Sequence, residues 1–171
     1  MKSYLAGLLF LLALVSCTSK NEVKPQKTID YGSMVVGTIS GHDTLAENSK
    51  AVAEKWSGVV KHKLNLNDSV QFKNFRILRI KTVGSDKENS YLLTADDAGG
   101  TFKVGTLVLL TKDNFYFDVE DISGRKTGRI IICQGVCEDN SCLPYVVVSG
   151  NEKHLVCSGC VECEKITGYA Y

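Results

Sequence analysis

The side chains best suited to chemistry in this sequence are thiols gathered near its C-terminal end. Six of the seven cysteines in the 171-residue chain lie within one segment. These six are Cys133, Cys137, Cys142, Cys157, Cys160 and Cys163. Thiols at this density can form disulfides, bind a metal ion or exchange electrons with another thiol pair.

Disulfides are the favoured interpretation, because the number is even and small loop-rich segments of exported proteins need cross-links. The sequence alone leaves their connectivity open. Segments 145–148 and 154–157 are rich in β-forming residues and flank turn-forming ones, so they predict a β-hairpin. This hairpin would bring Cys142 beside Cys157 and Cys160, and we therefore prefer a bridge from Cys142 to one of these two.

Two alternatives use the same thiols. Cys157, Cys160 and Cys163 are spaced three residues apart, and His154 precedes them by three more, so a turn could collect them as zinc ligands. Cys157 and Cys160 also form a C-x-x-C pair, the spacing of thiol oxidoreductases, although no βαβ pattern surrounds it. We expect structural disulfides and no cofactor, with zinc as the alternative.

The N-terminal segment has the pattern of an export signal. Lys2 precedes an apolar stretch at residues 5–14, which is too short to span a bilayer as a helix and has the length of a signal-peptide core. Leu14-Val15-Ser16-Cys17 follows directly. This order of an aliphatic residue, two permissive residues and a cysteine resembles the bacterial lipobox.

The resemblance implies that residues 1–16 are a lipoprotein signal peptide and that Cys17 is acylated after their removal. Two or three acyl chains anchor a protein firmly, because each buried methylene contributes about 0.8 kcal/mol. The residue after the cysteine is Thr18 rather than Asp, which favours the outer membrane if the cell is Gram-negative. As a whole, the chain resembles the small bacterial lipoproteins of uncharacterised activity that end in a cysteine-rich tail.

The organisation expected for the rest of the chain has three parts. Residues 17–32 form a lipidated cysteine and a polar, flexible tether. A globular domain follows at 33–133, and a cysteine-rich tail at 134–171. Lys and Arg number 20 against 19 Asp and Glu, so the chain lacks the basic excess of a general nucleic-acid binder. The expected partners are the membrane, through the lipid anchor, and another envelope protein.

Periodicity in the globular part predicts one helix and several strands. Residues 33–39 read as a first strand, and Thr44 with Glu47 fits a capping box that would start a helix. Apolar residues at helical spacing follow, with Trp56 as the core anchor. The strands expected after this helix are 75–83, 91–95, 101–104, 106–111, 115–119 and 129–133. This order predicts an α+β fold, with one N-terminal helix packed on an antiparallel β-meander as a roll or small barrel, and a disulfide-rich C-terminal hairpin.

None of the common catalytic motifs occurs in the sequence. His42 and His62 have no nucleophile near them in sequence, and Asp96-Asp97 reads as a turn rather than a calcium loop. The expected function is therefore a lipid-anchored envelope protein that acts as a binding or structural module braced by disulfides. The alternative is a metal-binding or thiol-redox lipoprotein that uses the C-terminal cysteines.

Overall fold

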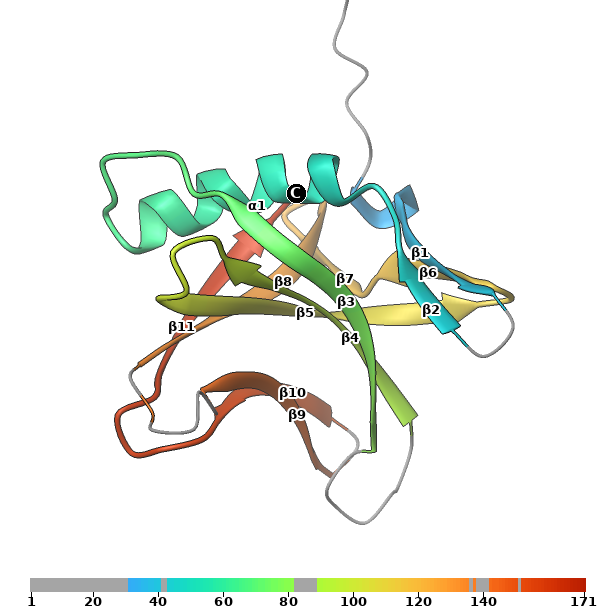
Figure 1. The fold of residues 1–171 in the computed structure, drawn as a ribbon. Helices are drawn as coiled ribbons and strands as arrows, with labels where there is room; N and C mark the ends of the chain where they lie inside the picture. Colours follow the sequence, from blue (N-terminus) through green and yellow to red (C-terminus); the bar gives the residue numbers. More distant parts are fainter. Residues whose placement is uncertain (1–30, 41–42, 82–88, 136, 138–141, 151) are drawn as a thin grey trace, which may run out of the picture.

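The computed structural model describes residues 31–40, 43–81, 89–135, 137, 142–150 and 152–171 (Figure 1). The predicted signal peptide, the lipidation site Cys17 and nearly all of the tether lie outside these residues, as does His42. Within the described ranges, no helix is long and apolar enough to cross a membrane.

The fold is mostly β, which makes the expected α+β class wrong. Strands hold 62% of the described residues and helices 14%. In chain order, the elements are η1 (Tyr31–Ser33), β1 (Val35–Ser40), β2 (Asp43–Ala46), α1 (Ser49–Lys63), β3 (Phe72–Lys81), β4 (Asn89–Asp97), β5 (Phe102–Thr111), β6 (Asn114–Phe117), β7 (Val119–Ile122), β8 (Arg125–Gln134), β9 (Leu143–Ser149), β10 (Glu152–Ser158) and β11 (Glu164–Ala170).

The excess of β-structure comes from longer strands than expected and from segments that the sequence does not predict as strands. Residues 101–104 and 106–111, expected as two strands, form the single strand β5. Most of the polar stretch 124–128, which lies between two expected strands, belongs to β8, and the last strand β11 is not among the expected strands. These segments become strands because each has a neighbouring strand to pair with, and such pairing overrides weak local preference.

β5 is the centre of an antiparallel, nine-stranded sheet among the described residues. One path through this sheet has the order β11-β8-β5-β6-β1-β2, while β4 joins β5 and in turn pairs with β3. The sheet curls until β2 approaches β3, where the Thr44 hydroxyl donates a 2.9 Å hydrogen bond to the Ile77 carbonyl. Helix α1 covers one side of this sheet, and the separate β9–β10 hairpin lies at the opposite end of the molecule (Figure 1).

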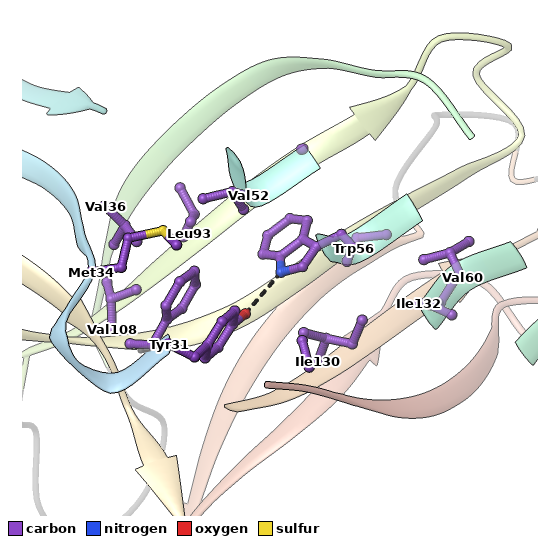
Figure 2. Packing of buried hydrophobic residues seen from close by; sticks show 14 of the residues in the cluster. Tyr31, Met34, Val36, Val52, Trp56, Val60, Leu93, Val108, Ile130 and Ile132 are labelled. Carbon is purple, nitrogen blue, oxygen red and sulfur yellow. Dashed lines mark hydrogen bonds between the residues drawn. The ribbon is translucent and has the colours of Figure 1, made fainter. Parts of the chain in front are cut away.

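The main core lies between α1 and the sheet (Figure 2). Val52, Trp56 and Val60, four residues apart on one helix face, are fully buried. The prediction that Trp56 anchors the core is therefore confirmed. Its indole N–H donates a 3.0 Å hydrogen bond to the hydroxyl of Tyr31, whose ring stacks on Phe117 with centroids 3.8 Å apart.

The capping box expected at the start of α1 is wrong. Thr44 lies in β2, and the helix begins at Ser49 after Asn48, which adopts a left-handed conformation with φ of 53°. The side chain of Glu47 accepts a 2.8 Å hydrogen bond from Thr38 of β1, and Asn48 donates one of 2.6 Å to the carbonyl of Val35. Of the two residues expected in the capping box, Glu47 thus bonds to β1 and Thr44 to Ile77 of β3.

Candidate functional site

Three disulfides connect the β9–β10 hairpin and the segments beside it to the main sheet. They are Cys133–Cys157, Cys137–Cys160 and Cys142–Cys163, with Cα–Cα distances of 5.5, 5.7 and 5.4 Å. All three distances lie within the range of ordinary disulfides. All six C-terminal cysteines, Cys133 and the five of the tail, are therefore cross-linked, which confirms a disulfide-braced module.

The preferred pairing of Cys142 with Cys157 or Cys160 is wrong, although the hairpin itself is confirmed. In the hairpin register Leu143 opposes Ser158 and Pro144 opposes Cys157, so Cys142 lies just beyond the paired residues. Cys157 meets Cys133 of β8, the strand beneath the hairpin. The sequence does not predict the strand β11. Its pairing with β8 places Cys163, which precedes β11, within reach of Cys142.

The disulfides surround a second, smaller hydrophobic cluster between the hairpin and the sheet. Its buried members are Leu92, Ile131, Cys133, Cys137, Cys142, Val146 and Leu155. Strands alternate their side chains between two faces, so Ile130 and Ile132 enter the main core while Ile131 and Cys133 face the hairpin. The same alternation places Leu92 of β4 beneath the hairpin, and its neighbour Leu93 in the main core.

The residues of the zinc and redox alternatives do not form a thiolate site. Cys157, Cys160 and Cys163 each bond to a different cysteine, so the C-x-x-C pair is not an internal disulfide. The Nε2 of His154 lies 3.8 Å from a carboxylate oxygen of Glu152 instead. Throughout the described ranges, no group of three or more His, Cys, Asp or Glu side chains is arranged to hold a metal ion.

A charged groove runs beside the hydrophobic cluster, between β10 and the face of the main sheet. We call it the hairpin groove, and it encloses about 470 Å³. Its lining residues are Leu107, Asp118, Glu120, Arg129, Glu152, Lys153, His154 and Leu155. A cavity of about 310 Å³ adjoins it through Asp118 and Lys153, and one of about 380 Å³ adjoins it through Arg129 and His154.

Opposite charges face one another inside the hairpin groove. Arg129 forms a 2.6 Å ion pair with Glu120, and both side chains are partly exposed. Burial raises the pKa of the half-buried Asp118 carboxyl, whereas the nearby positive charge of Lys153 opposes that shift. The groove therefore offers cationic and anionic groups together, rather than a surface of one sign.

Two buried polar atoms, one in the hairpin groove and one in an adjoining cavity, have no hydrogen-bond partner in the described part of the chain. One is the hydroxyl of Ser90, a residue that is 3% exposed and lines the adjoining cavity together with Asp118 and Lys153. The other is the Nε of Arg129. Ser90 lines the adjoining cavity and Arg129 lines the groove itself. Buried polar groups are nearly always satisfied, so an unpartnered one beside a cavity indicates a place where a ligand or water supplies the missing bond.

Sequence reasoning did not identify most of the hairpin groove. Asp118 and Glu120 alternate with Phe117 and Val119, a pattern that indicates a strand with one solvated face. The polar face of that strand is covered in part by β10, a contact between segments about 35 residues apart. Only His154 was a candidate site residue, and it lies in the groove rather than in a metal centre.

In comparisons with known proteins, no family model, no curated protein and no solved structure matches the chain.

Proposed function

We propose that this chain is a lipid-anchored, disulfide-braced binding module of the bacterial cell envelope, and that the hairpin groove is its ligand site. The observation that carries the binding role is the groove beneath a hairpin held by three disulfides, with the Nε of Arg129 in it and the Ser90 hydroxyl in the adjoining cavity both without a partner among the described residues. Disulfides persist in oxidising compartments, which supports a location outside the cytoplasm.

The lipobox-like Leu14-Val15-Ser16-Cys17 supports the anchoring part of the proposal. Expression of the full chain in a bacterium fed an alkyne-labelled fatty acid tests it directly. We expect label on the wild-type chain, loss of the label in Cys17→Ser, and extraction of only the wild type into a detergent phase. Equal labelling of both chains, or no labelling of either, would contradict the lipid anchor.

The bracing has a direct consequence for binding. Each disulfide closes a loop of between 21 and 24 residues, so the hairpin cannot leave the sheet without breaking a covalent bond. The groove walls are therefore held in place before any ligand arrives. A preorganised site loses less conformational entropy on binding than a flexible one.

The ligand class that fits the hairpin groove is a small polar molecule with both donors and acceptors, because the charges lining the groove are of both signs. Backbone amide NMR with four defined probes tests this: glycine as a zwitterion, glucose for hydroxyls, acetate for an anion and guanidinium for a cation. We expect saturable shifts around Ser90, Asp118 and Arg129 with glycine or glucose, and their loss in Arg129→Ala. Saturation by none of the probes, or shifts scattered over the surface, would contradict the binding site.

A further inference from the structure

A second surface lies where α1 meets the last residues of β11, at the end of the molecule away from the β9–β10 hairpin (Figure 1). We call it the basic–aromatic face and define it by Lys55, His62, Lys63, Arg125, Tyr169 and Tyr171. All but Arg125 of these residues line a hollow of about 530 Å³. The floor of this hollow is small and apolar, with Val59 and Ala170.

Positive charge dominates this face. No Asp or Glu lines the hollow, whereas Lys55 and Lys63 both do. Arg125 extends the positive surface, because its guanidinium lies 5.6 Å from the centre of the Tyr171 ring. Helix α1 as a whole carries four lysines and one glutamate, and its last turn consists of Lys61, His62 and Lys63.

Two aromatic rings of the face are open to solvent. Tyr169 is 42% and Tyr171 65% exposed. Tyrosine is enriched where proteins meet the lipid headgroups, because its ring is apolar and its hydroxyl is polar. Lysine and arginine near such a surface are attracted by anionic lipids. The Lys55 ammonium donates a 2.8 Å hydrogen bond to the Tyr171 carbonyl oxygen, which leaves Lys63 and Arg125 as the cations best placed to meet a ligand. Exposed tyrosines beside these two cations are the combination that a negatively charged bilayer surface would bind.

The chain enters the folded domain beside this same face. Tyr31, the first described residue, is held by its hydrogen bond from Trp56, and the Lys55 ammonium lies 5.7 Å from the centre of its ring. Cys17 precedes Tyr31 by 14 residues, which span at most about 50 Å when fully extended. A lipid on Cys17 would therefore hold this point of entry within about 50 Å of the bilayer and raise the local concentration of the face at the membrane.

We propose that the basic–aromatic face rests on anionic phospholipid headgroups and orients the domain, so that the β9–β10 hairpin points away from the membrane. This inference rests on the proposed lipid anchor for its cellular setting. The contact itself needs no lipid on the protein: the headgroup phosphates interact with Lys63 and Arg125, and the rings of Tyr169 and Tyr171 enter the interface.

Vesicle co-sedimentation tests the face without the anchor. The chain from residue 17 onward, carrying Cys17→Ser, is mixed with phosphatidylcholine vesicles that contain either no phosphatidylglycerol or about one third of it. We expect binding only to the anionic vesicles, weakened by added salt. A basic residue near the surface contributes about fivefold in partitioning, so Lys63→Glu with Arg125→Glu lowers it by about 25-fold or more.

The matched control is Arg79→Glu with Lys81→Glu, which makes the same change in net charge. Both residues are exposed and lie near the end of β3 that points away from α1 (Figure 1). The control should bind like the parent, and circular dichroism should show that both variants are folded. Absence of binding to anionic vesicles, equal binding to neutral ones, or an equal loss in the control would overturn the proposal.

The two proposals fail separately. Fatty-acid labelling reports on Cys17 alone, and the vesicle assay uses a chain that cannot be acylated there. Labelling without vesicle binding would leave a flexibly tethered domain with no oriented face, and would overturn only the present inference. Vesicle binding without labelling would keep the face and remove the anchor.

Discussion

The indole N–H of Trp56 and the hydroxyl of Tyr31 form a buried 3.0 Å hydrogen bond that joins α1 to the first described residue of the chain. Tyr31 is 1% exposed and Trp56 is fully buried. We expect Tyr31→Phe to lower the free energy of unfolding by about 1–3 kcal/mol, because it leaves a buried donor without an acceptor. Urea denaturation measures this loss, with Tyr169→Phe on the surface as the control. An unchanged midpoint in Tyr31→Phe would contradict the prediction.

The Tyr31 hydroxyl also predicts a dependence of stability on alkaline pH. Burial raises its pKa far above the ordinary tyrosine value, and the hydrogen bond from Trp56 opposes that shift. The folded chain therefore keeps this proton at pH values where the unfolded chain loses it. Stability falls as the pH rises above about 10, the pKa of an unperturbed tyrosine. The decline measured by thermal melts should be shallower in Tyr31→Phe, and an equal slope in both proteins would argue against this role.

The disulfide between Cys133 and Cys157 should stabilise the protein through the unfolded state. It links β8 to β10 across 24 residues of sequence. Replacing both cysteines with alanine is expected to lower the free energy of unfolding by about 3 kcal/mol, because the unfolded chain regains the entropy of an open loop. Guanidinium denaturation provides the measurement, and reducing agent should destabilise the wild type more than this variant.

The same connectivity can be read from a non-reducing peptide map. The oxidised chain should weigh about 6 Da less than the reduced one, as three disulfides require. Fragments should remain joined as Cys133–Cys157, Cys137–Cys160 and Cys142–Cys163. A fragment that joins Cys142 to Cys157 or Cys160 would contradict the structure.

Close packing of the hairpin on β5 depends on Gly105. A Cβ at this position would come within 2.5 Å of Pro144 in β9. We expect Gly105→Ala to cost about 1–3 kcal/mol through overpacking, in thermal or chemical denaturation. Gly58→Ala in α1 is the control and should stabilise the protein. Nothing lies within 4 Å of its added Cβ, and alanine is more favourable than glycine in a helix by about 1 kcal/mol. Destabilisation of equal size at both glycines would refute this account.

Asp118 should make the folded state less stable once it ionises. Burial raises its pKa in the folded protein, so folding binds extra protons between the ordinary aspartate pKa and this higher value. Stability therefore falls as pH rises through that window. We expect Asp118→Asn to raise the melting temperature at pH 7 and to have little effect at pH 3. A variant that is less stable than the parent at pH 7 would show that the carboxylate is favourable there.

Local sequence was enough for the features that depend on neighbours along the chain. Apolar residues at helical spacing predict α1 with Trp56 in the core, and two apolar runs around a turn predict the β9–β10 hairpin; both are confirmed. An even number of crowded cysteines predicts disulfides, and the structure contains three. These predictions succeed because periodicity, turn chemistry and cysteine density are properties of short segments.

The tertiary structure decided what depends on residues far apart. It converted segments with weak local preference into β2, the start of β8 and β11, and so changed the fold class from α+β to mostly β. It paired Cys142 with Cys163, because β11 docks against β8. It also brought Asp118, Arg129 and Lys153 into one groove. Long-range strand pairing selects the partner of each side chain, and no local pattern encodes which partner that is.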